Sequence, residues 1–294
     1  MRIGYPCSNL TLGVSAARTF RLASYSTDLL VRTVEANLDA LQDILRWNDR
    51  HGIRFFRISS GTIPFASHPV MAYPWQSHFA DRLSIIGRYI VDHEMRVNLH
   101  PGQYTLLNSI REEVVEKSIA ELAYHADLLD LLGLDATNKI QIHVGGVYGD
   151  KPAAIVRFVV AYSRLPEPIR RRLVIENDER QFNLVDTLTI HSRTGVPVLL
   201  DTLHHSIHNE GETLTEALDA VKPTWDGHGP AMIDYSSQHP ERRGGAHAAS
   251  IVLDDFEPVL NELRWRDIDL MFEIKDKETS VLKAMEFMQV RIAQ

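Results

Sequence analysis

The sequence contains little cysteine, no long hydrophobic run and no excess of basic residues. Cys7 is the single cysteine among 294 residues, so an intrachain disulfide and an all-sulfur metal site are both excluded. No apolar run approaches the ~18 residues of a membrane span, and the first residues lack the apolar core of a signal peptide. We therefore expect a cytoplasmic protein with no membrane partner.

The net charge also limits the partners that the chain can have. Its formal value of −8 argues mildly against binding to a polyanion such as nucleic acid. Bound divalent cations would offset several acidic side chains, and basic residues cluster locally at 170–172 and 242–243. Nucleic acid therefore remains open as a partner.

Short apolar segments alternate with amphipathic ones along the whole chain. Segments typical of buried parallel strands lie at 2–6, 55–59, 97–100, 139–144, 173–177, 197–201, 231–235 and 269–274. Segments with apolar residues at helical spacing lie at 29–47, 82–92, 114–132, 153–163, 184–192, 213–220, 256–263 and 280–292. This alternation predicts one α/β domain over 1–294, a (β/α)₈ TIM barrel. A doubly wound open sheet is the main alternative.

Imidazole and carboxylate side chains recur at the downstream ends of five predicted strands, at His100, His143, Glu176, Asp201 and Glu273, and others lie nearby in the sequence. The candidates are His100, His143, Glu176, Asp201, His204, Asp234, His247 and Glu273. Each alone has an ordinary explanation, such as a hydrogen-bonded histidine or an aspartate that caps a helix. Because parallel strands of a barrel all end at one face, the recurrence predicts a metal cluster at the C-terminal face, with Mn²⁺ or Zn²⁺ suited to these ligands.

Two reaction classes fit such a cluster. Metal ions ~3.5–4 Å apart can lower the pKa of a water molecule and stabilise both oxygens of a phosphodiester displacement. A similar ligand set can move hydride or protons on a sugar, as in metal-dependent isomerases. The ligand types alone leave both open.

The motifs between the strands resemble those of one known family, the UV damage endonucleases. The segments that carry the resemblance are GYPCSNLT (4–11), FRIS (56–59), IPFASHP (63–69), HPGQY (100–104), HVGG (143–146), ENDER (176–180), DTLHH (201–205), SQHP (237–240) and GAH (245–247). The likeness covers nearly the whole chain. It implies a metal-dependent barrel, similar to endonuclease IV, that nicks DNA on the 5′ side of ultraviolet photoproducts.

The resemblance also implies roles for individual residues. It implies metal ligands at His68, His100, His143, Glu176, Asp201, His204, His247 and Glu273, with Glu176, Asp201, His204 and Glu273 as the catalytic set. We expect two to three divalent ions, with Mn²⁺ favoured over Zn²⁺, Co²⁺ or Mg²⁺. Gln103 and Tyr104 would probe the duplex, while Tyr5 and Asn9 would line a pocket for the extruded lesion, which is already poorly stacked and so costs less to flip.

One strand departs from the family pattern. Where the family commonly has Lys-x-His, this sequence has Met232-x-Asp234. Asp234 can still offer a carboxylate oxygen to a metal, whereas Met232 cannot carry a charge.

The resulting expectation is a monomeric endonuclease for UV-damaged double-stranded DNA. It would hydrolyse the phosphodiester immediately 5′ to cyclobutane dimers and 6-4 products, leaving 3′-hydroxyl and 5′-phosphate ends, with abasic sites as a further substrate left open. The rivals are a sugar isomerase or epimerase on the same barrel, and a damage-binding protein that has lost catalysis through the change at Met232 and Asp234.

Overall fold

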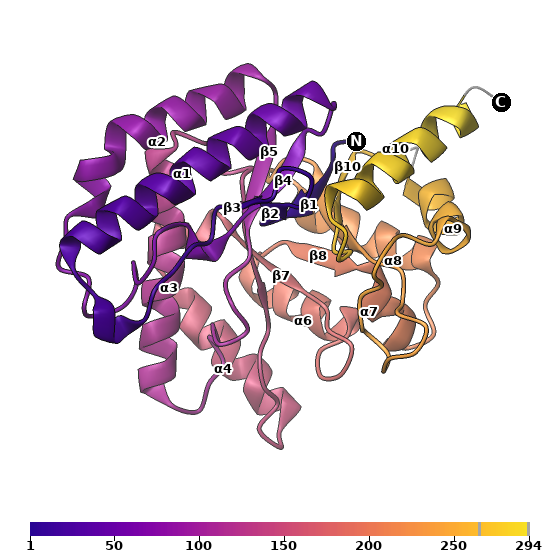
Figure 1. Cartoon of the computed structure of the whole chain (residues 1–294). Helices are drawn as coiled ribbons and strands as arrows, with labels where there is room; N and C mark the ends of the chain where they lie inside the picture. Colours follow the sequence, from indigo (N-terminus) through magenta and orange to yellow (C-terminus); the bar gives the residue numbers. More distant parts are fainter. Residues whose placement is uncertain (264–265, 293–294) are drawn as a thin grey trace.

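A closed barrel of eight parallel strands forms the centre of the molecule, and the computed structural model describes it within residues 1–263 and 266–292 (Figure 1). The strands are β1 (Ile3–Pro6), β4 (Phe55–Ile58), β5 (Arg96–Leu99), β6 (Ile140–His143), β7 (Leu173–Glu176), β8 (Val198–Asp201), β9 (Ala231–Tyr235) and β10 (Ile268–Phe272). They follow one another around the barrel in chain order, and β10 pairs with β1 to close it. Each strand falls on one of the predicted segments, so the predicted (β/α)₈ barrel is confirmed.

Helices surround the barrel (Figure 1). The longer ones are α1 (Thr27–Arg50), α2 (Trp75–Asp92), α3 (Glu112–Leu131), α4 (Lys151–Ser163), α6 (Leu184–Thr194), α8 (Leu214–Val221), α9 (Leu253–Leu263) and α10 (Glu278–Ile292). Helix α2 begins at Trp75 rather than at the predicted position 82, because Trp75 and Phe79 extend its buried face upstream. The short helices α5 (Glu167–Arg170) and α7 (Thr202–Ile207) were not predicted, since four or six residues are too few to show a helical periodicity. Within the part of the chain described, no helix has the length and apolar character needed to cross a membrane.

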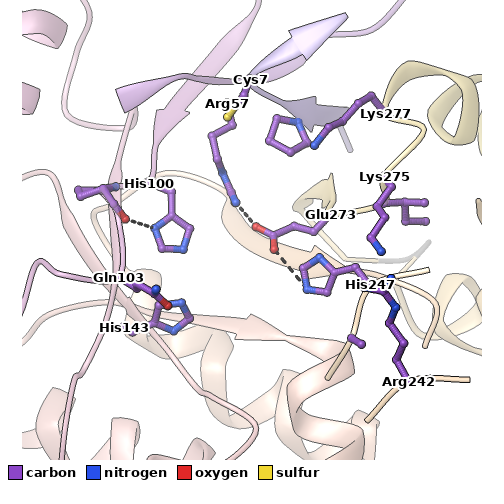
Figure 2. Close-up of a pocket in the computed structure, with 14 residues that line it drawn as sticks. Cys7, Arg57, His100, Gln103, His143, Arg242, His247, Glu273, Lys275 and Lys277 are labelled. Atoms are coloured by element: carbon purple, nitrogen blue, oxygen red, sulfur yellow. Dashed lines mark hydrogen bonds and ion pairs between the residues drawn. The ribbon is translucent and has the colours of Figure 1, made fainter. Parts of the chain in front are cut away.

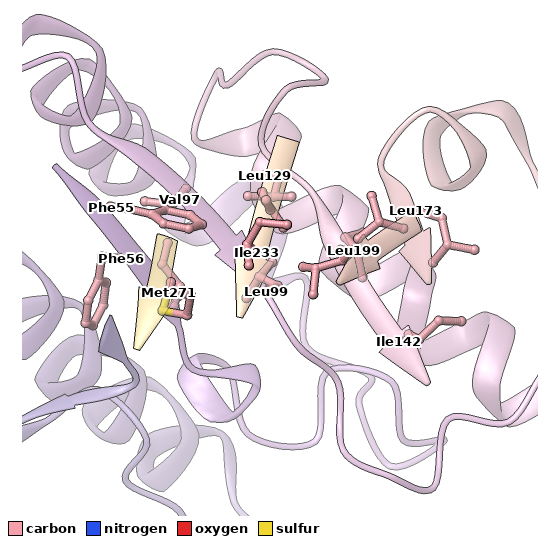
Figure 3. Packing of buried hydrophobic residues seen from close by; sticks show 14 of the residues in the cluster. Phe55, Phe56, Val97, Leu99, Leu129, Ile142, Leu173, Leu199, Ile233 and Met271 are labelled. Atoms are coloured by element: carbon pink, nitrogen blue, oxygen red, sulfur yellow. The ribbon is translucent and has the colours of Figure 1, made fainter. Parts of the chain in front are cut away.

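The strands are buried on both faces, which explains their continuous apolar character. Figure 3 shows side chains such as Phe55, Val97, Ile233 and Met271 packed around the strands. Strands β1 and β4 approach so closely that a Cβ atom on Gly4 would lie 1.8 Å from the carbonyl oxygen of Phe55. A side chain at position 4 would therefore force these two strands apart.

Charged side chains join the strands at the N-terminal end of the barrel. Asp269 accepts a hydrogen bond of 2.9 Å from buried Arg96 and one of 3.2 Å from Arg2. Lys139 is fully buried, donates to the carbonyl of Arg171 at 2.9 Å, and lies 3.1 Å from Nδ1 of His228. Since barrel enzymes build their sites at the opposite end, these charged side chains lie outside the candidate site.

The loop after β1 carries a two-stranded hairpin, β2 (Ser8–Asn9) with β3 (Val14–Ser15). Glu278, at the start of α10, accepts hydrogen bonds from the backbone nitrogen of Thr11 at 2.6 Å and from its hydroxyl at 2.9 Å. The first loop of the barrel is thereby held by the final helix.

Candidate active site

Three side chains from neighbouring strand ends form the first group of metal-type ligands. His143 and Glu176 are register partners at the ends of β6 and β7, and His100 follows β5. Nδ1 of His143 lies 2.7 Å from Oε1 of Glu176, and Nε2 of His100 lies 3.5 Å from the same oxygen. This Nδ1 is buried, and Glu176 is its charged partner. Two imidazole nitrogens and one carboxylate oxygen within 4.8 Å of one another can hold a divalent ion.

The second group is built by a strand that turns directly into a helix. Asp201 ends β8 and caps α7 by accepting a hydrogen bond of 2.9 Å from the backbone nitrogen of His204. This cap returns His204 toward the strand end, where its Nδ1 lies 3.4 Å from Oδ2 of Asp201. His247 reaches the same place from the loop after β9, where it forms a backbone bridge with Gln238. The predicted Asp-x-x-His pair therefore lies in one cluster with His247.

Arg57 links the carboxylates at the floor of the site. It comes from β4 and is 3% exposed. Its Nη2 donates to both oxygens of Asp234, at 2.9 and 3.0 Å, and its Nη1 donates to Glu273. Asp201, Asp234 and Glu273 also lie close enough together to form a third group of metal-type ligands. Arg57 was not among the predicted site residues.

A buried glutamine extends this network to the first group. Gln141 accepts a hydrogen bond of 2.8 Å from Nη2 of Arg57 and donates to Asp234 at 2.6 Å and to Glu176. Arg57 and Gln141 thus connect the carboxylates of Glu176, Asp234 and Glu273 at the floor of the site.

Burial and close pairing shift the pKa values of these groups in opposite directions. Burial alone would lower the pKa of His143, but the neighbouring Glu176 raises it to about 9. Burial raises the pKa of Glu176, but His143 and His100 outweigh it and lower that pKa well below its usual range. Burial also raises the pKa of Glu273, and Arg57 outweighs it, lowering the pKa to about 2. The site is therefore a set of paired charges, which suits the exchange of protons for metal ions.

A pocket of about 570 Å³ opens above the ligand groups. In Figure 2, His100, His143 and Gln103 lie on one side of it, and Glu273, His247, Lys275 and Lys277 lie on the other. Arg242 also lines the pocket. These cations lie around a floor rich in carboxylates, although the chain as a whole is acidic.

The two predicted probing residues lie in the loop after β5. Gln103 lines the pocket, and Tyr104 is 81% exposed at the tip of the loop. An aromatic ring this exposed is not part of the core, so packing does not account for it.

Tyr5, Asn9 and His68 lie outside both the ligand groups and the lining of this pocket. Tyr5 is fully buried on the outer side of β1, where its hydroxyl donates to Asn48 of α1 at 2.6 Å and accepts from Asn9 at 2.7 Å. Alternate residues of a strand face opposite sides, so Tyr5 can face α1 and not the barrel interior. Its hydrogen bond with Asn9 supports the first loop. His68 is exposed and outside the three ligand groups, and its Nδ1 accepts from the backbone nitrogen of Val70 at 3.0 Å.

A (β/α)₈ barrel with imidazole and carboxylate groups at its C-terminal mouth is the architecture of a barrel enzyme, and these groups fit divalent metal ions. The family model for UV-endonuclease UvdE matches residues 1–293. The chain therefore belongs to the UvdE family and is an endonuclease.

Individual relatives agree with this assignment. The UV DNA damage endonuclease of Clostridium perfringens is 39% identical over 97% of this chain and 70% of its own length, and that of Bacillus velezensis is 32% identical over 97% and 93%. The crystal structure of SacUVDE is 46% identical, covers 98% of both chains and superposes with a TM-score of 0.94. Endonuclease IV from Thermus thermophilus shares the fold alone, with 17% identity and a TM-score of 0.56 over 93% of this chain and 92% of its own.

Proposed function

We propose that this protein is a metal-dependent DNA repair endonuclease that cuts immediately 5′ to ultraviolet photoproducts and leaves 3′-hydroxyl and 5′-phosphate ends. The observation that carries the proposal is the convergence of two carboxylate–imidazole groups beneath a cation-lined pocket in a chain of the UvdE family. The proposed substrates are duplexes that carry cyclobutane dimers or 6-4 products.

The residues present suit divalent cations of the Mn²⁺ type. His100, His143 and Glu176 would hold one ion, and Asp201, His204 and His247 would hold another. Mixed nitrogen and oxygen donors favour Mn²⁺, Zn²⁺ or Co²⁺ over Mg²⁺, and Nδ1 of His143, 2.7 Å from Oε1 of Glu176, is a buried nitrogen that can serve as a ligand atom. Such ions would supply the activation of a water molecule and the neutralisation of charge on the phosphate.

The side chains around the pocket would position the DNA. Arg242, Lys275 and Lys277 suit the phosphates that flank the scissile bond. Gln103 and Tyr104 project from one loop, where an amide can pair with orphaned bases and an aromatic ring can stack on them. A lesion that is already unstacked is the cheapest nucleotide to extrude, which would make damage the basis of selection.

An incision assay with Mn²⁺ tests this proposal. Three end-labelled duplexes would carry one cyclobutane dimer, one abasic site or no damage. We expect a single cut immediately 5′ to the dimer and no cut in the undamaged duplex. Cutting of the abasic duplex alone would move the specificity toward that of endonuclease IV, and binding to the dimer without any cut would favour a damage-binding protein.

The variant Glu176→Ala ties the activity to the site. Glu176 is 2% exposed and contacts both histidines of the first group, so its loss should abolish incision. The exposed variant Glu113→Ala, on the outer helix α3, is the matched control and should cut as the wild type does. Incision by Glu176→Ala at the wild-type rate would refute the mechanism.

A further inference from the structure

The floor of the site contains a permanent cation that belongs to the protein. The guanidinium of Arg57 is held by Asp234 and Glu273, by Gln141 at 2.8 Å and by Asn98 at 3.4 Å. Arginine stays protonated at all relevant pH values, and burial makes its position fixed. Any metal ion at the floor would have to share these carboxylates with this guanidinium.

The hydrogen bonds of Asp234 differ from those of the other ligand-type carboxylates. Its Oδ2 accepts from Arg57 at 2.9 Å and from Gln141 at 2.6 Å, and its Oδ1 accepts from Arg57 at 3.0 Å. The side chain is 1% exposed, and Asp234 does not line the pocket. Both oxygens of Asp234 are therefore engaged by hydrogen-bond donors of the protein.

Glu273 is divided between the guanidinium and the pocket. Its Oε1 accepts from Nη1 of Arg57, while its Oε2 faces Nε2 of His247 at 3.7 Å (Figure 2). One oxygen thus remains available to the second ligand group, and Arg57 fixes the direction in which it points.

We propose that Arg57 is a positioning residue that occupies the third cation position of the cluster, so that the chain binds two metal ions and Asp234 is the counterion of Arg57 rather than a metal ligand. The inference rests on the proposed function, because it assumes the two metal sites described there. Asp234, which stands where the family commonly has histidine, would thus serve to neutralise Arg57 and not to bind a metal ion. A neutral histidine at position 234 would leave the guanidinium with one fewer carboxylate.

Counting bound ions tests this inference without relying on activity. The protein is stripped with a chelator, dialysed against Mn²⁺ and analysed for manganese per chain. We expect two ions in the wild type and two in Asp234→Asn, since the amide removes a counterion but no ligand. The matched control is Asp201→Asn, the register partner of Asp234 on β8, which should lose at least one ion.

The possible results separate the inference from the proposed function. Three ions in the wild type, or the loss of one in Asp234→Asn, would overturn the inference and leave the metal-dependent endonuclease intact. No bound manganese in the wild type would instead contradict the proposed function itself. If Asp234→Asn does not fold, the wild-type count and the positions of manganese in an anomalous difference map decide, because an ion bound to Asp234 would also refute the inference.

Discussion

Replacing Lys139 by methionine should stabilise the protein at neutral pH. Lys139 lies fully buried at the N-terminal end of the barrel, near Arg96 and Arg172. Burial, and then these two guanidinium groups, lower its pKa from 10.5 to about 7. Between those pH values the unfolded chain holds the proton and the folded chain does not. The free energy of unfolding therefore falls as the pH decreases from about 10 to about 7. Below about pH 7 both states hold the proton, and the contribution of Lys139 no longer changes with pH.

The size of the effect follows from the same two pKa values. Each unit of pKa difference corresponds to ~1.4 kcal/mol, so burying Lys139 lowers the free energy of unfolding at pH 7 by on the order of 4–5 kcal/mol. Methionine removes this cost but also the contacts with the carbonyl of Arg171 and with Nδ1 of His228, which together offset about 1–2 kcal/mol. We expect Lys139→Met to be more stable than the wild type by roughly 3 kcal/mol at pH 7, with the advantage vanishing near pH 10.

Guanidinium chloride unfolding at several pH values between 7 and 9.5 measures this difference. Lys117→Met, on the exposed face of α3, is the control and should differ little from the wild type at any pH. Incision by Lys139→Met should match the wild type, because Lys139 lies at the opposite end of the barrel from the ligand groups. A difference in stability that does not change with pH would refute the reasoning.

Three further results are expected. Alanine at Gln103 or Tyr104 should reduce the preference for damaged over undamaged duplex about tenfold or more, since stacking on one base is worth ~1–3 kcal/mol, while manganese binding stays unchanged; an unaltered preference in competition assays would exclude a probing role. Alanine at both Lys275 and Lys277 should weaken binding to any duplex and lower the salt dependence of log K by about two, as titrations at several salt concentrations would reveal. Adding Mn²⁺ at ~100 times its dissociation constant should raise the melting temperature of the stripped wild type by roughly 5 °C but that of Asp201→Asn by less, and equal shifts would argue against Asp201 as a ligand.

The strands and most of the ligand groups could be predicted because their signals are local. An apolar segment that ends in His143, Glu176 or Asp201 predicts a strand and also places the ligand-type side chain at the C-terminal end of that strand. Since parallel strands of a barrel end together, no long-range information was needed to gather these residues at one face. His247 required more, because a loop and not a strand delivers it.

The floor of the site could not be predicted because its partners are far apart in the sequence. Arg57 lies 177 positions from Asp234 and 216 from Glu273, and nothing in its own strand indicates that carboxylates will surround it. Burial of an arginine is unfavourable without such partners, so local patterns argue against it. The placement of His68 and Tyr5 was missed for a related reason: a motif identifies a residue but does not say which way its side chain faces.

The pairing of β10 with β1 has a consequence for how the protein is made. During synthesis the chain emerges with β1 first, and β1 has only one of its two barrel neighbours until β10 appears. Glu273 directly follows β10, and the Glu278 that holds the first loop comes soon after it. A nascent chain that ends before these residues has an open sheet and an incomplete ligand set. A chain truncated before β10 would therefore lack both the closed barrel and Glu273, and we expect it not to cut DNA.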